Sequence, residues 1–154
     1  DVIPDVVVMG KGMGGGMPVG AFTASAEMMD LLSHDPKLGH ITTFGGHPVS
    51  CAASLATLKV IHDEIIFFEM EKKALKIREI FSKIPDVSEV RRKGMMLAAQ
   101  MENFDILKKN IDRLIDLGII TDWFLYCDNA MRISPPLNIS WEEITWLENK
   151  IKAL

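Results

Sequence analysis

One lysine stands where a short apolar run meets a cluster of glycines. The run is Val6-Val7-Val8-Met9, and Lys11 follows it among Gly10, Gly12, Gly14, Gly15 and Gly16. Three consecutive valines predict a buried strand, and the glycines allow a tight turn close to a bulky group. Because burial disfavours a charged amine, we expect a lowered pKa for Lys11. Such a lysine can form a Schiff base with a carbonyl group; the alternative is a solvated loop lysine.

Two other segments are suited to binding anions. Thr42 and Thr43 open the segment Thr42-Thr43-Phe44-Gly45-Gly46, ahead of a helix predicted from Pro48. Hydroxyls and free backbone N–H groups there could bind a phosphate, or could serve only to start the helix. Arg132 lies in an apolar strand just before Pro135-Pro136. Its planar guanidinium suits a carboxylate, although a structural ion pair is the alternative.

The elements that must position these residues follow from periodicity, caps and turn residues. Strands are predicted at residues 6–9, 19–24, 87–92, 95–101, 119–120, 123–127 and 130–134. Helices are predicted at 26–32 after an N-cap at Ser25, from Pro48, at 67–81, at 103–117, and after Ser140, which forms a capping box with Glu143. This α/β alternation indicates a division of the chain near residue 62.

Three blocks of this sequence resemble the class III pyridoxal-phosphate-dependent aminotransferases, which include acetylornithine, ornithine and 4-aminobutyrate aminotransferases. The blocks are Pro4–Gly12 with Gly14-Gly15-Gly16 and Pro18-Val19-Gly20, then Thr42–Pro48, then Arg132–Leu137. The resemblance implies the C-terminal part of an α/β, fold-type I transferase. Residues 1–62 would end a large cofactor-binding domain, and 63–154 would form a small α/β domain. Asp1 starts mid-pattern, so we expect the N-terminus to be cut.

The resemblance also implies roles for individual residues. Lys11 would carry a Schiff base with pyridoxal 5'-phosphate, and Arg132 would bind the substrate carboxylate. Thr43, with Thr42 beside it, would contact the cofactor phosphate of the partner subunit in a homodimer with shared active sites. The implied reaction moves an amino group between an amino acid, or an ω-amino acid, and a 2-oxo acid. One departure is His47, where the family more often has Asn.

The sequence also allows other functions. The same fold also supports class III aminomutases and decarboxylases, and the chain could be a non-catalytic fragment, because the family's aspartate for the pyridine nitrogen lies upstream of the lysine. Gly10, Gly12 and Gly15 also match a dinucleotide-binding fingerprint. That fingerprint requires a helix that starts within the glycines, whereas a strand-like segment follows here.

The composition of the chain argues against several other classes of protein. The chain has 154 residues, is 48% hydrophobic and carries a net charge of −4. A negative net charge gives no indication of the basic surface that binds nucleic acid. No apolar run is long enough to span a membrane. The four histidines lack metal-ligand spacing, so no metal is predicted. Cys51 and Cys127 are expected to be buried thiols, and Trp123, Phe124 and Tyr126 to be core residues. Two unpaired thiols suit a reducing compartment, so a cytoplasmic location is predicted.

Overall fold

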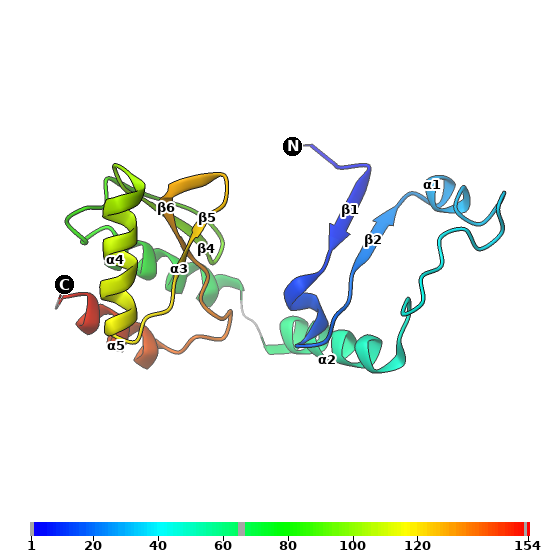
Figure 1. Cartoon of the computed structure of the whole chain (residues 1–154). Coiled ribbons are helices and arrows are strands. Elements are labelled where there is room, and N and C mark those ends of the chain that lie inside the picture. Colours follow the sequence, from blue (N-terminus) through cyan, green and yellow to red (C-terminus); the bar gives the residue numbers. More distant parts are fainter. Residues whose placement is uncertain (1, 65–66, 153) are drawn as a thin grey trace. The chain divides into compact units, whose positions relative to one another are not determined.

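The structure is a computed structural model that describes residues 2–64, 67–152 and 154 (Figure 1). Its internal contacts divide the chain into an N-terminal unit, residues 1–64, and a C-terminal unit, residues 65–154. Each unit has its own sheet, a two-stranded one in the first and a four-stranded one in the second. The assignment of residues 1–62 to a large cofactor-binding domain and of 63–154 to a small domain stays a prediction.

The N-terminal unit is built around a β-hairpin and a long helix. Its elements are β1 (Val6–Met9), a 3₁₀ helix η1 (Lys11–Gly14), β2 (Ala21–Ala24), α1 (Ala26–Asp30) and α2 (Pro48–Glu64) (Figure 1). The two strands pair antiparallel, with Val7 opposite Thr23. The predicted cap is confirmed, because the Ser25 hydroxyl accepts a hydrogen bond from the Met28 N–H at the start of α1.

The prediction that β1 is buried is wrong for the described residues. All four residues of β1 are exposed, and Val8 is 79% exposed. A hairpin of two strands has two faces, and the described residues of this unit supply no layer over either of them. Among residues 2–63, only Gly14, Ser50 and Ser54 are buried. The apolar residues Leu55, Leu58 and Val60 of α2 are likewise exposed. This unit therefore presents apolar surface rather than a core.

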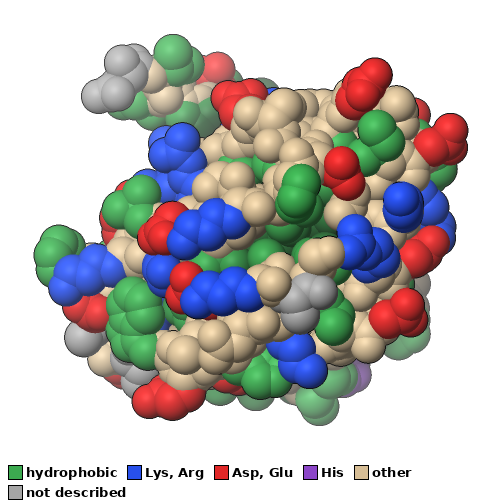
Figure 2. Space-filling view, turned by 90° about the vertical axis from the view of Figure 1, so that its left-hand side faces the viewer, with side chains coloured by type: hydrophobic (Ala, Val, Ile, Leu, Met, Phe, Trp, Pro, Cys, Tyr) green, Lys and Arg blue, Asp and Glu red, His purple; other side chains and the backbone are tan. Residues whose placement is uncertain are grey.

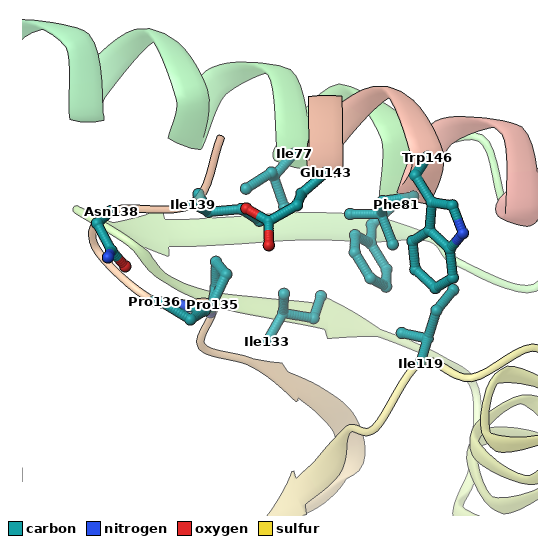
Figure 3. A pocket seen from close by; sticks show the side chains of 11 residues that line it. Ile77, Phe81, Ile119, Ile133, Pro135, Pro136, Asn138, Ile139, Glu143 and Trp146 are labelled. Atoms are coloured by element: carbon teal, nitrogen blue, oxygen red, sulfur yellow. The ribbon is translucent and has the colours of Figure 1, made fainter. Parts of the chain in front are cut away.

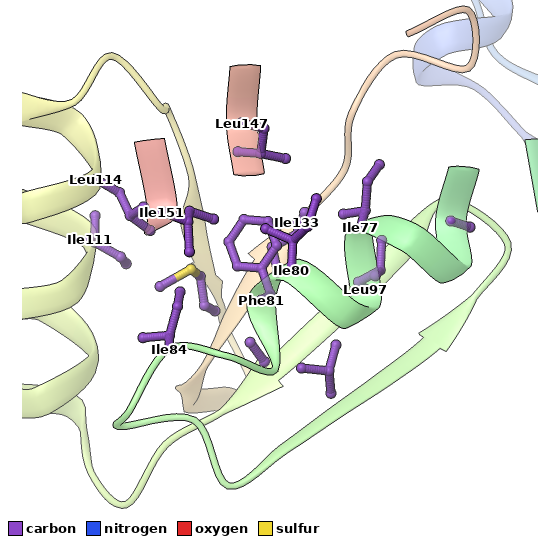
Figure 4. Close-up of a cluster of buried hydrophobic side chains, with 14 of the residues drawn as sticks. Ile77, Ile80, Phe81, Ile84, Leu97, Ile111, Leu114, Ile133, Leu147 and Ile151 are labelled. Atoms are coloured by element: carbon purple, nitrogen blue, oxygen red, sulfur yellow. The ribbon is translucent and has the colours of Figure 1, made fainter. Parts of the chain in front are cut away.

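The C-terminal unit packs three helices against an antiparallel sheet. The strands are β3 (Glu89–Lys93), β4 (Met96–Gln100), β5 (Asp122–Phe124) and β6 (Cys127–Ile133), in the order β3-β4-β6-β5. The helices are α3 (Phe67–Phe81), α4 (Phe104–Asp116) and α5 (Trp141–Ile151). Strand residues such as Leu97 and Ile133 point into a core that they share with the helices (Figure 4).

The helix predictions for this unit are confirmed. Helix α3 has the predicted bounds and buries Ala74, Ile77 and Phe81 at helical spacing. Asn103 caps α4, and Ser140 with Glu143 forms the predicted capping box of α5. Because these signals depend on neighbouring residues in one helix, they can be recognised in a sequence without knowledge of the tertiary fold.

The strand predictions before Arg132 were partly wrong. Residues 119–120 are outside the strands, and Ile120 is 91% exposed. The segment predicted as one strand at 123–127 contains a reversal between β5 and β6, so Tyr126 is exposed at the turn instead of lying in the core. Trp123 and Phe124 are half-buried. The predicted burial of Cys51 is also wrong, because α2 exposes it, while Cys127 is half-buried.

Charges of both signs are interspersed on the face of the C-terminal unit that Figure 2 shows. One cluster of ion pairs joins α3 to α5. Lys76 Nζ lies 3.1 Å from Glu148 Oε2, and Lys83 also pairs with Glu148. The hydrogen bond from Lys76 and the nearby lysine charges hold the pKa of Glu148 below its usual value, although desolvation opposes this. Among the described residues, no helix is both long and apolar enough to cross a membrane.

The concentration of buried residues in one unit leads to a stability prediction. A fragment of residues 65–154 should unfold cooperatively in urea, because its apolar core is self-contained. Within it, Leu97→Ala should cost about 2–5 kcal/mol of unfolding free energy, since Leu97 is fully buried. Met96→Ala on the same strand is the matched control and should change stability by less than about 0.5 kcal/mol. Non-cooperative unfolding of the fragment, measured by circular dichroism, would contradict a separate core.

Candidate active site

Lys11 begins η1, immediately after the hairpin strand β1. Its backbone is in the left-handed region with φ 51°, whereas Gly10 before it is extended. For a residue other than glycine, this conformation costs on the order of 1–3 kcal/mol and must be maintained by its surroundings. The Lys11 side chain is exposed. The expected burial of this lysine is thus wrong for the described residues, for the same reason that β1 is exposed: only a two-stranded hairpin is present.

The loop that carries Lys11 is seated on α2 through a glycine. Gly15 ends η1 with φ +58°, and its N–H donates to Gly12 O at 3.2 Å. A Cβ on Gly15 would lie 2.2 Å from Thr57 Oγ1 and 3.1 Å from the Ala53 carbonyl oxygen. Thr57 Oγ1 is itself held in place, because it donates to the Ala53 carbonyl at 3.0 Å. Only glycine satisfies both the backbone angle and this close approach.

Thr42 and Thr43 lie in a turn directly ahead of α2. The Gly45 N–H donates to the Thr42 carbonyl at 3.1 Å, and the His47 N–H donates to the Phe44 carbonyl at 3.2 Å. The two threonines are exposed, and Gly46 has φ +70°. Two hydroxyls therefore precede the N-terminus of a 17-residue helix, where the helix dipole and free N–H groups favour an anion. Among the described residues, no hydrogen bond joins these threonines to Lys11.

Arg132 lies in β6 of the C-terminal unit, and the structure gives it a partner. Its Nη2 is 2.9 Å from Asp122 Oδ2, and the two residues are opposite each other in the β5–β6 pairing. Both side chains are about half exposed. Asp122 was missed in the sequence, although the hairpin register could have indicated it. The ion pair considered as the alternative is present, and binding of a substrate carboxylate by Arg132 stays a prediction.

Three of the four histidines, His34, His40 and His62, have a hydrogen-bonding partner close by in the chain. His34 Nδ1 lies 3.1 Å from the Asp30 carbonyl oxygen, and His40 Nδ1 lies 3.0 Å from that of Leu32. Within the part of the chain that the structure describes, no group of three or more His, Cys, Asp or Glu side chains could hold a metal ion.

The C-terminal unit also has an apolar pocket of about 490 Å³ (Figure 3). It lies between α3, α5 and the segment after β6, and Ile77, Pro135 and Trp146 are among its lining residues. Lys73 on α3 donates to the Ile139 carbonyl at 2.6 Å and ties this segment to the helix. The pocket contains neither Lys11, the two threonines nor Arg132, and its one carboxylate, Glu143, is engaged in the helix cap.

The topology excludes the dinucleotide-binding alternative. That fingerprint belongs to a β-strand, a helix and a second, parallel strand. Here β1 and β2 are antiparallel neighbours, and the element among the glycines is a single 3₁₀ turn. No long helix therefore has its N-terminus within the glycines, where a pyrophosphate would bind.

Comparison with known proteins agrees with the three sequence blocks. The sequence model of the family described as aminotransferase class-III matches residues 1–154. This chain belongs to the class III aminotransferases. Acetylornithine aminotransferase from Corynebacterium efficiens is 38% identical over 143 residues, which is 93% of this chain and 34% of that protein. The resemblance seen in the sequence is thereby confirmed.

Solved structures of the family share the fold. The ornithine aminotransferase from Toxoplasma gondii has a TM-score of 0.82 and 30% identity, over 98% of this chain and 36% of that protein. The acetylornithine aminotransferase from Elizabethkingia anophelis has a TM-score of 0.77 and 29% identity, over 100% of this chain and 40% of that protein. The predicted α/β, fold-type I architecture is confirmed. This class III chain spans about a third of the length of the relatives it matches.

The seating of the lysine loop gives a prediction for this class III chain. In the complete protein, Gly15→Ala should destabilise the loop by roughly 1–3 kcal/mol, because the left-handed backbone and the clash with Thr57 both oppose a Cβ. Gly12→Ala is the matched control, since nothing lies within 4 Å of its Cβ position. Hydrogen exchange of η1 and α2 amides should increase in the first variant only. Equal exchange in both would show that Gly15 is dispensable.

Proposed function

We propose that this chain is the C-terminal part of a pyridoxal 5'-phosphate-dependent aminotransferase. The enzyme would move an amino group between an amino acid, or an ω-amino acid, and a 2-oxo acid. The observation that carries the proposal is Lys11, held in a left-handed conformation at the end of β1. It lies within a segment that matches the class III family. In this role, Lys11 Nζ would form the Schiff base with the cofactor aldehyde.

The residues present fit this cofactor. An exposed primary amine can reach an aldehyde, and two exposed hydroxyls before α2 can donate to a phosphate. When bound, the cofactor supplies the electron sink for the reaction. Lys11 Nζ would hold the cofactor through its aldehyde group and would move a proton at the substrate carbon.

The roles of the other residues depend on assembly. Thr43, with Thr42 beside it, would donate to the cofactor phosphate of the partner subunit, so a homodimer with shared active sites is part of the proposal. Arg132 would bind the substrate carboxylate. Residues 1–62 would belong to the large domain and 63–154 to the small domain. Strands β1 and β2 expose apolar side chains. This exposure supports the proposal that other parts of the complete protein cover the two strands. We place the enzyme in the cytoplasm.

Another reaction on the same fold is the second candidate. A structure named as a phospholyase from Arthrobacter in complex with phosphoethanolamine has a TM-score of 0.81 and 26% identity to this chain. The fold by itself does not choose the reaction. An amino-donor screen of the complete protein decides, because formation of a new amino acid from a 2-oxo acid supports transamination. Release of ammonia from one substrate supports a lyase, release of carbon dioxide supports a decarboxylase, and isomerisation of one substrate supports an aminomutase.

The assignment of Lys11 can be tested by chemical trapping. Borohydride reduction of the complete enzyme with its cofactor should leave the cofactor on Lys11, as located by peptide mapping. Lys37, another exposed lysine in the same unit, should carry none. Lys11→Ala should lower kcat by at least about 10²–10⁴-fold, the typical contribution of one positioned acid–base group. Cofactor trapped on Lys37, or on no lysine, contradicts the assignment.

The role of Thr43 predicts a change in cofactor affinity. Thr43→Ala in the complete protein should weaken binding of pyridoxal 5'-phosphate by roughly 1–3 kcal/mol, because a hydrogen bond to a charged group is lost. Thr43→Ser retains the hydroxyl and should bind nearly as well, and Thr23→Ala on β2 controls for loss of an exposed threonine elsewhere. Fluorescence titration measures the affinity. An unchanged affinity in Thr43→Ala would leave this turn with a structural role only.

A further inference from the structure

We propose that Asp122 is a positioning residue that orients the Arg132 guanidinium for the substrate carboxylate. This inference rests on the proposed function, because it concerns how the proposed carboxylate site is held. It adds a specificity-determining residue from β5 to that site. The contacts that carry it are all within the C-terminal unit.

Asp122 is itself held in place on β5. Its Oδ1 accepts a hydrogen bond from the Trp123 N–H at 2.8 Å, while its Oδ2 accepts one from Arg132 Nη2 at 2.9 Å. The two carboxylate oxygens thus have different partners, one on the backbone and one on the guanidinium. Thr121 Oγ1 donates to the Arg132 carbonyl at 2.5 Å and ties the two strands together beside the pair. A fixed carboxylate therefore restrains a long, otherwise mobile side chain.

The restraint leaves most of the guanidinium free. Arginine has five N–H donors, and only Nη2 of Arg132 is engaged among the described residues. Nε and Nη1 remain for a second carboxylate in a two-point contact. On the other side of Arg132, the register partner in β4 is Ala98, whose small side chain leaves the guanidinium uncovered. The side chain is accordingly about 42% exposed.

A second arginine on the same sheet shows the contrast. Arg91 of β3 is also a register partner of Ala98, so it lies in the same cross-strand row as Arg132. Its Nη1 donates to Glu89 Oε2 at 3.0 Å and its Nη2 donates to Gln100 Oε1 at 2.8 Å. Both ends of that guanidinium are occupied by the protein, as in a structural ion pair. Arg132 is held at one end only, which is the arrangement that suits a ligand-binding arginine.

The test compares substrates with and without the carboxylate. The complete enzyme with its cofactor is assayed with an accepted amino acid and with the matching amine. Asp122→Ala should raise KM for the amino acid about three- to tenfold, with kcat and the KM of the amine within about twofold. Asp122→Asn, whose amide oxygen can still face Arg132, should give an intermediate KM. Glu89→Ala, which removes the corresponding partner of Arg91, should leave both substrates unchanged.

The outcomes separate this inference from the proposed function. An unchanged or lowered KM for the amino acid in Asp122→Ala, or equal effects on both substrates, overturns the positioning role. If that variant fails to fold by thermal melting, Asp122→Asn decides by the same criterion. The variant Arg132→Lys is assayed with the same two substrates. Loss of acid preference there, but not in Asp122→Ala, overturns only the role of Asp122, whereas no loss in Arg132→Lys removes the carboxylate site itself. Trapping on Lys11 tests the transaminase independently of both.

Discussion

The close approach of Gly15 to α2 is the constraint on which the geometry of the lysine loop depends. Thr57 and the Ala53 carbonyl occupy the space that a Cβ on Gly15 would need. The left-handed angle at Gly15 closes η1, and η1 begins with Lys11, which is also left-handed. A strained lysine backbone is thus stabilised by a turn that rests on a helix. Helix α2 also follows the Thr42–Thr43 turn. In the proposed homodimer, one helix would therefore support the lysine of one active site and the threonines of the other.

The two units use their apolar residues differently. In the C-terminal unit, three helices and a sheet enclose side chains such as Leu97, Leu107 and Met131 completely. In the N-terminal unit, by contrast, the valines of β1 and the leucines of α2 remain exposed. Apolar surface of that extent supports the proposal that other parts of the protein cover it. This difference agrees with a chain that spans about a third of the length of its class III relatives.

The cross-strand row of Arg91, Ala98 and Arg132 shows how strand register gives two arginines different partners. Arg91 and Arg132 flank Ala98 across β4, and each has an acidic partner. Residue type alone makes them equivalent. Their difference is the number of guanidinium nitrogens that the protein already occupies, and this depends on Gln100 and on the short strand β5. The capacity of an arginine to bind a ligand is therefore a property of its neighbours.

The sequence by itself determined the helices, their caps, the hairpin strands and the family. A capping box, helical periodicity and glycine turns each depend on a few neighbouring residues. Each of the three family blocks is likewise a short stretch of sequence, so none of these signals requires knowledge of distant contacts. Only the tertiary structure decided the exposure of β1, the reversal at Tyr126 and the pairing of Arg132 with Asp122. Burial depends on which layers cover a strand, and an ion pair between strands depends on register. The layers over β1 are decided by residues far apart in the chain, whereas the Arg132–Asp122 pair depends on the register of one hairpin, which a shift of a single residue would change.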